Sequence, residues 1–342
     1  MNLYRLELKR VCKTRMTAIL LAIALVLAVV MAYLPVTFIG WTELDASGNE
    51  VRYTGLKAIR KRQEQQVSGT ITPDVMQEAL ETYQLVYRQY DASSINDIPV
   101  EVFYKELARY QPLVNNAKEA FADPKTGMAP GVMGLTAEDM QNFYSQLPKR
   151  LESVIWLEQS GKPGYEQAQA IAQKKFDAVQ KPFTYSFGVS SDAMDYQTLL
   201  SLLLTLLCAV IAAPVFASDA QTGAQDIQLC TKNGGLRLAA AKLAAAFSIT
   251  GAAYLLCGVV WILVTNALFG WESTQTSVQW LFSVTSLLPY TVGQMEWVML
   301  VANFLIFFAE VAFVLMASVW AKNNLTALSV ALISVVAPLI VY

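Results

Sequence analysis

The sequence predicts an all-α fold: a polytopic α-helical membrane protein with a helical extracellular domain between its first and second spans. Of the 342 residues, 55% are hydrophobic and only 15% are charged, whereas soluble proteins carry about 25% charged residues. Several apolar runs reach the length of about 20 residues that a helix needs to cross a bilayer. One long segment, residues 40–195, differs from them because it holds 16 Lys/Arg and 21 Asp/Glu. These observations predict separate apolar and water-exposed parts.

The composition also limits the chemistry that the chain can perform. It contains no histidine, the commonest general base and metal ligand in proteins. The four cysteines have no zinc-site spacing and indicate no disulfide framework. A formal net charge of −2 argues against a nucleic-acid partner. We therefore expect no metal and no cofactor.

The N-terminal segment, residues 1–39, is predicted to form an interfacial stretch followed by the first membrane span, Thr17–Ile39. The stretch before the span contains five basic residues and one acid, Glu7. By the positive-inside rule, this end stays in the cytoplasm and the helix runs outward. The alternative is a cleaved signal peptide with a weak site at Val30 and Ala32. The apolar core exceeds the usual 7–15 residues of a signal peptide, which favours the span.

Residues 40–195 have a net charge of −5 and are predicted to form an extracellular helical domain. Thr72-Pro73-Asp74 has the order of a helix N-terminus: a capping residue, a proline and an acid. Three further helices are predicted: one around 103–110, one from Thr136 with a break at Pro148, and one over 165–180. Aromatic residues recur along these helices. They could form a ligand surface, but packing between the helices is the favoured interpretation.

The remaining residues, 196–342, contain four more apolar runs, predicted as spans: Thr198–Ala217, Leu243–Leu268, Val298–Trp320 and Leu325–Tyr342. The shorter run Val278–Leu288 is interpreted as an interfacial or re-entrant segment. Five spans would leave the C-terminus outside in the middle of an apolar run. Either a sixth span is missing from the sequence, which is the favoured interpretation, or 278–288 crosses the membrane.

A polar loop, residues 218–242, separates the second and third spans and is predicted to be cytoplasmic. Thr222 and Gln225 fit a capping box that would start a short helix at Gly223. The helix would end near Lys232, at a left-handed turn in 233–235. Because both ends of the helix connect to spans, it could transmit movement from a docked partner. The alternative is an ordinary loop whose charges only set the topology.

Few residues could carry catalysis. The sequence has no G-x-x-x-x-G-K-[ST] loop for ATP and no G-x-S-x-G elbow for a serine hydrolase. We therefore do not expect an enzyme. Glu310 lies inside the fourth predicted span, where a charge costs about 3 kcal/mol or more. It could face a transport path or be a hydrogen-bonded structural residue.

The polar loop resembles a connection found in a known family. The residues in question are Asp219, Gly223, Leu229, Lys232-Asn233-Gly234 and Ala241-Lys242. In this order they resemble the link between the second and third helices of ABC transporter permease subunits of the type-2 exporter class, in a group common in Gram-positive bacteria. The predicted large helical outer segment after the first span also resembles that family, whose members have such a segment at the same place. Asp219 departs from the more usual Glu, and Gly235 stands where a basic residue is common.

The resemblance implies a permease subunit whose ATP hydrolysis takes place in a separate subunit. It implies an ATP-binding ABC subunit in the cytoplasm as partner, a second permease copy or paralogue, and a multi-pass location in a bacterial cell membrane. The expected ATPase-coupling residues are Asp219, Thr222, Gly223, Gln225, Asp226, Leu229, Lys232 and Arg237. Members of the family have six spans.

A second hypothesis is a membrane-anchored sensory or scaffolding protein whose extracellular domain binds a ligand or a partner. It would need a cytoplasmic output domain; none is present in these residues, although a C-terminal part missing from the sequence could contain one. A third hypothesis, a membrane enzyme that uses Glu310, is the weakest because other polar residues are scarce in the spans.

Overall fold

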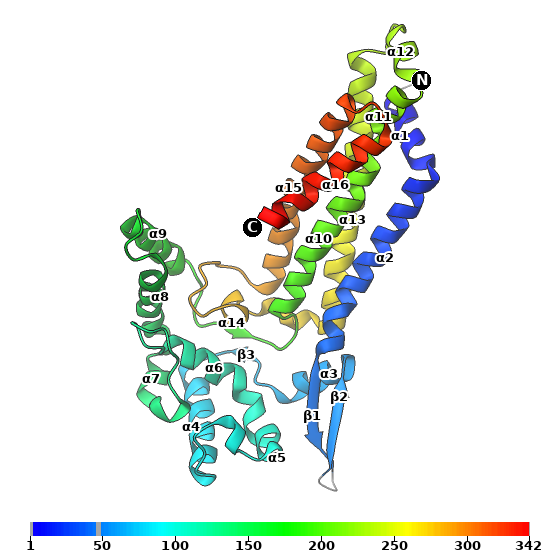
Figure 1. Cartoon of the computed structure of the whole chain (residues 1–342). Coiled ribbons are helices and arrows are strands. Elements are labelled where there is room, and N and C mark those ends of the chain that lie inside the picture. The colour runs from blue at the N-terminus through cyan, green and yellow to red at the C-terminus, as the bar shows by residue number, and fades with distance from the viewer. Residues whose placement is uncertain (1–2, 46–48, 342) are drawn as a thin grey trace. The chain divides into compact units, whose positions relative to one another are not determined.

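The computed structural model describes residues 3–45 and 49–341. Residues 1 and 2 of the N-terminal segment and Tyr342 of the last apolar run lie outside them. The chain divides into two compact units. The first unit contains Met1–Pro35, Asp192–Thr265 and Glu296–Tyr342, and the second contains Val36–Ser191 and Asn266–Met295. The helical character predicted from the sequence is confirmed (Figure 1).

The first unit is a bundle of long apolar helices. Its elements are α1 (Leu3–Lys13), α2 (Arg15–Phe38), α10 (Ser191–Ala212), α11 (Pro214–Gln221), α12 (Ala224–Leu229), α13 (Leu236–Phe269), α15 (Val292–Trp320) and α16 (Asn324–Val341). Among the described residues, four segments are long and apolar enough to cross a membrane: Arg15–Phe38, Ser191–Gln221, Leu236–Phe269 and Val292–Trp320. They match the first four predicted spans. The fifth predicted run forms α16, in which the apolar part Asn324–Ala337 is shorter.

Small side chains bring the helices of the bundle close together. Ala24, Ala28 and Ala32 recur every fourth residue on α2 and are buried. They belong to a core that also contains Tyr254 and Phe307. Small residues at this spacing allow helix backbones to approach closely inside a membrane.

The second unit is built from shorter elements. Its helices include α3 (Leu56–Gln65), α4 (Pro73–Gln89), α5 (Val100–Val102), α6 (Gln111–Ala120), α7 (Ala137–Gln141), α8 (Phe143–Gln159), α9 (Tyr165–Asp177) and α14 (Val278–Leu281). The π-helical turn η2 (Phe103–Leu107), and the 3-10 turns η1 (Ile95–Asp97), η3 (Ala108–Tyr110), η4 (Val132–Gly134) and η5 (Trp271–Gln275) complete it. Two antiparallel pairs join β1 (Gly40–Leu44) to β2 (Glu50–Thr54) and β3 (Gly69–Thr70) to β4 (Thr184–Tyr185).

Two predicted helix starts in this unit are confirmed. Thr72 caps α4 by accepting a hydrogen bond from the Val75 amide, and Pro73 occupies the first turn. Thr136 and Asp139 form the reciprocal capping box of α7. Most of the aromatic residues pack the core, as favoured from the sequence: Tyr83, Tyr87, Tyr110, Phe143 and Phe176 are buried. Trp156 is the exception because it is exposed.

Several predictions for the second unit are wrong. The β1–β2 hairpin was not expected. The helix predicted around 103–110 consists of π-helical and 3-10 turns, which break the regular hydrogen bonding between α5 and α6. The chain breaks at Asn142, between α7 and α8, while Pro148 lies inside α8. For residues 278–288 the structure contradicts only the less favoured interpretation, a spanning helix, because only the four residues of α14 are helical there.

Candidate functional site

The polar loop begins with a helix break that the sequence explains. Pro214 has no backbone N–H, so the regular bonding of α10 stops and α11 starts with unpaired amides. The Ser318 hydroxyl of α15 accepts hydrogen bonds from the amides of Phe216 and Ala217, both at 3.1 Å, and donates to the Ala213 carbonyl at 2.6 Å. One side chain thus provides hydrogen-bond partners for the backbone groups at the break and links α11 to α15.

The short helix that follows is present, but its start differs from the prediction. The Thr222 hydroxyl donates to the Ser218 carbonyl at 2.9 Å, so it belongs to the end of α11 and forms no capping box with Gln225. Gly223 then adopts a left-handed conformation, with φ 69°, and α12 begins at Ala224. Positive φ is easy only for glycine, which lacks the Cβ that would clash. By contrast, none of residues 233–235 has a positive φ, so the prediction of a left-handed turn there is wrong.

Gly234 has a different role at the other end of α12. Its φ is not in the left-handed region. A Cβ built on Gly234 would lie 1.5 Å from the carbonyl oxygen of Gln228, whereas one on Gly235 would meet nothing within 4 Å. Gly234 therefore allows the chain to pass closely against the end of α12 before α13 begins.

A buried carboxylate lies at the centre of this region. Asp219 on α11 is 8% exposed. Its two oxygens accept hydrogen bonds from Arg10 Nη1 of α1, at 3.1 and 3.2 Å. Its Oδ2 also accepts from Lys242 Nζ of α13, a side chain that is itself 4% exposed. A buried carboxylate needs this pairing because an isolated ion would be strongly disfavoured there.

Further contacts extend the cluster to α12. The Lys242 ammonium donates to Gln228 Oε1 at 3.1 Å and lies 5.4 Å from the centre of the Phe216 ring. On the other side, Arg10 Nε pairs with Glu7 Oε2 at 3.1 Å. We call Glu7, Arg10, Asp219, Gln228 and Lys242 the Asp219 cluster. It contains two cations and two carboxylates, and it connects α1, α11, α12 and α13.

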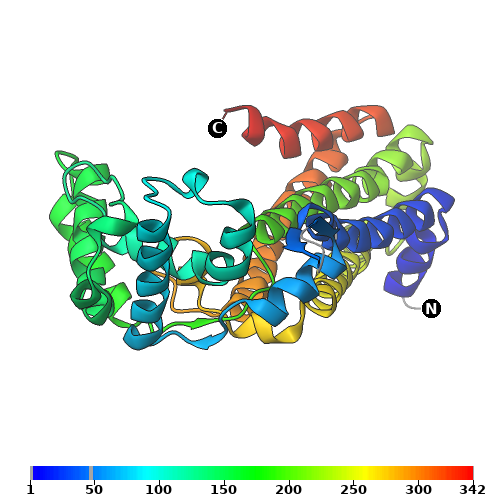
Figure 2. The same ribbon diagram turned by 90° about the horizontal axis from the view of Figure 1, so that it is seen from below.

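The outer side of α12 is exposed and partly apolar. Ile227 and Leu229 are 73% and 59% exposed, and Leu236 at the start of α13 is 90% exposed. The charged residues Asp226 and Lys232 are exposed too. Both views show α11 and α12 (light green) at the same end of the first unit as α1 (blue) (Figures 1 and 2). We call residues 224–236 the α12 surface.

The predicted coupling residues thus separate into three kinds. Asp219 is buried at the centre of the cluster. Thr222 and Gly223 form the turn between α11 and α12. The other five are exposed: Gln225, Asp226, Leu229, Lys232 and Arg237, of which Arg237 donates to the Asn233 side chain at 3.2 Å.

Sequence reasoning missed the partners of Asp219. Arg10 is one of several basic residues near the N-terminus, and it lies 209 positions before Asp219. Nothing local distinguishes it from its neighbours. Lys242 could have been found, because it is a cation that precedes a long apolar run without an acid nearby in the sequence. The exposed Ile227 was also missed.

Glu310 lies apart from these residues, within α15. It is half-buried and accepts a hydrogen bond from the Ser334 hydroxyl of α16, a partner that the sequence did not indicate. Both residues line a cavity of about 530 Å³, together with Thr205 and Asn303. Asn303 Nδ2 donates to the Ser201 hydroxyl at 3.3 Å on the same cavity wall. The structure therefore gives Glu310 one hydroxyl partner, Ser334, beside a cavity whose wall is mainly apolar with a few hydroxyl and amide groups.

Searches against protein-family models, curated proteins and solved structures find no match to this chain. Within residues 3–45 and 49–341, no three His, Cys, Asp or Glu side chains are grouped so that they could hold a metal ion.

Proposed function

We propose that the chain is the membrane-spanning permease subunit of an ATP-driven exporter, and that the α12 surface is the contact for a separate ATPase. The observation that supports this most is the Asp219 cluster. Its ion pairs join α1, α11 and α13 through Arg10, Asp219 and Lys242, and Lys242 also donates a hydrogen bond to Gln228 of the short helix α12. The exposed Ile227 and Leu229 provide apolar area on the outer side of the same helix. Such area is typical of protein contact sites.

The cluster suggests how movement would pass from the ATPase to the bundle. When ATP binding draws the ATPase subunits together, the α12 surface would move with them. Gln228 and Lys242 link α12 to α13, and Asp219 links both to α1. Separating Asp219 from Lys242 would leave buried charges unpaired, at a cost of about 3–5 kcal/mol for a broken buried pair, and α12 is tied to this pair by the hydrogen bond from Lys242 to Gln228. The helices would therefore move together, as in other two-state switches.

The proposal includes a topology and partners. The N-terminus and the α12 surface would face the cytoplasm of a bacterial cell, and residues 40–195 would be extracellular. A second permease copy or a paralogue would complete the transport path. Glu310 and the cavity beside it would lie along that path.

A charge reversal on the α12 surface tests the proposal. The variant Asp226→Lys/Lys232→Glu keeps the net charge but inverts the local pattern. The tagged chain is purified from native membranes, and P-loop ATPases that copurify are identified by mass spectrometry. We expect the reversal to abolish copurification. The matched control is Lys162→Glu/Glu166→Lys, an equivalent swap of exposed residues in the second unit, which should have no effect. Unchanged assembly with the α12 variant would contradict the proposal and favour the sensory or scaffolding function.

A further inference from the structure

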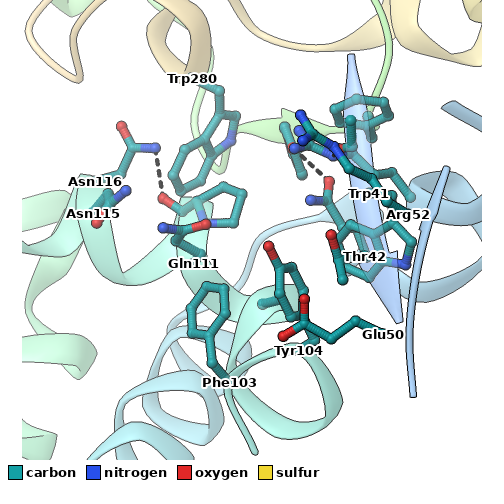
Figure 3. A pocket seen from close by; sticks show the side chains of 17 residues that line it. Trp41, Thr42, Glu50, Arg52, Phe103, Tyr104, Gln111, Asn115, Asn116 and Trp280 are labelled. Atoms are coloured by element: carbon teal, nitrogen blue, oxygen red, sulfur yellow. Dashed lines mark hydrogen bonds between the residues drawn. The ribbon is translucent and has the colours of Figure 1, made fainter. Parts of the chain in front are cut away.

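The second unit contains a cavity that the proposed function does not use. Its volume is about 880 Å³, within the range of about 300–1,000 Å³ that is typical of small-molecule sites. Residues of β1, β2, η2, α6 and α14 line it. Figure 3 shows Trp280 on one side of the cavity, Trp41 on the other, and the hydroxyl of Tyr104 pointing into the space between them.

Aromatic rings form much of the wall, and their neighbours hold them in place. The Trp280 ring is stacked on Phe143, with ring centres 6.4 Å apart, and meets the edge of Phe183 at 6.2 Å. Across the cavity, Trp41 and Tyr104 make an edge contact at 5.7 Å. Packing fixes these rings, and the half-buried Tyr104 leaves part of its ring open as a preformed flat surface on which a planar ligand can stack.

The charged groups of the wall favour an anion. The lining contains two arginines, Arg52 and Arg62, and one acid, Glu50. Arg62 is half-buried: its Nε donates to the Gly40 carbonyl at 3.1 Å, and its guanidinium lies 5.1 Å from the centre of the Phe187 ring. Burial lowers the pKa of Arg62 because it disfavours the charged form. A bound anion would offset that cost.

We infer that this cavity binds a planar aromatic carboxylate. The ring would stack on Tyr104, and the carboxylate would accept hydrogen bonds from the arginines, whose planar geometry suits it. This site is independent of the α12 surface, and its test is independent of the ATPase.

Three probes of the same ring system test the charge preference. 2-Naphthoate is the anion, 2-naphthamide its neutral analogue, and 2-naphthylmethylammonium the cation. Binding to the full chain in lipid nanodiscs is measured by isothermal titration calorimetry. We expect the anion to bind about tenfold tighter than the neutral probe, and the cation to bind weakest. Equal affinities for the three probes would overturn the inference, because they would indicate apolar partitioning only. Tightest binding of the cation would overturn it too.

Substitutions of the two exposed charges test the site with little risk to folding. Arg52→Gln should weaken 2-naphthoate binding about threefold to tenfold, and Glu50→Gln should strengthen it by a similar factor. Both should leave 2-naphthamide unchanged. Arg60→Gln is the matched control, because Arg60 is exposed on α3 and does not line the cavity. If Arg52→Gln behaves like Arg60→Gln, the anion does not bind in this cavity and the inference fails.

Discussion

Asp219 is the residue on which the Asp219 cluster depends, because its carboxylate contacts both cations of the cluster. Arg10 and Lys242 approach it from α1 and α13. Buried ion pairs add little net stability, since the loss of hydration offsets the attraction. Their removal one partner at a time is costly, however. The cluster therefore fixes which helices stay together more than it raises the total stability.

Asp219→Asn should strongly destabilise the first unit. The change leaves the buried Lys242 ammonium without a counter-charge, while Arg10 is exposed enough to reach water. We expect a loss of about 3 kcal/mol, measured as a lower Tm in detergent. The control Asp226→Asn, at an exposed position of α12, should change stability by about 0.5 kcal/mol or less. Similar Tm values for the two variants would contradict a buried ionic centre.

The buried hydroxyl of Tyr185 should make the stability of the second unit depend on alkaline pH. Burial raises its pKa to about 12, from an ordinary value of 10.0. Between these pH values the unfolded chain loses the hydroxyl proton while the folded chain keeps it, so stability falls as pH rises. Tyr185→Phe should lower stability at pH 7, because the hydrogen bond to Gln66 is lost, but should make it less sensitive to pH between 10 and 12. Tyr90→Phe, at an exposed position, is the control. Parallel curves for the wild-type and Tyr185→Phe chains would contradict the assignment.

At the scale of the elements, α12 shows what a local pattern can and cannot predict. A short helix after Gly223 was expected and is present. The T-x-x-Q pattern was misassigned because Thr222 can bond backward, to Ser218, as well as forward. A short motif does not reveal which of two adjacent helices its side chain bonds to. The close approach of Gly234 to Gln228 is likewise invisible in the sequence, because it depends on how α12 and α13 meet.

Gly234→Ala should rearrange the turn between α12 and α13. The added Cβ would overlap the Gln228 carbonyl, so the backbone must move. The same change at Gly235 meets open space and is the matched control. Exposed Cys230, which follows α12, reports on the turn. We expect its maleimide labelling rate to change by about threefold or more in Gly234→Ala and to stay constant in Gly235→Ala. Equal rates in both variants would show that the turn does not need Gly234.

At the scale of the whole molecule, the sequence predicted four spans well, because an apolar run of 20 residues is an unambiguous signal. The second unit was predicted less completely. Residues 40–54 form a hairpin too short to show a clear alternation, and 278–288 join a core whose other buried members lie between positions 71 and 185. The contact between Arg10 and Asp219 spans 209 positions. Contacts of this kind come from tertiary packing, which no local pattern records.

The central claim is that the α12 surface contacts an ATPase. Its most direct test is a photo-crosslinker at Leu229, used in native membranes, with captured proteins identified by mass spectrometry. A crosslinker at Val26, which is exposed on α2, is the control. We expect Leu229 to capture a P-loop ATPase, Val26 to capture none, and the Asp226→Lys/Lys232→Glu variant to lose the capture. If Leu229 captures no ATPase although labelling places it in the cytoplasm, the permease account is contradicted.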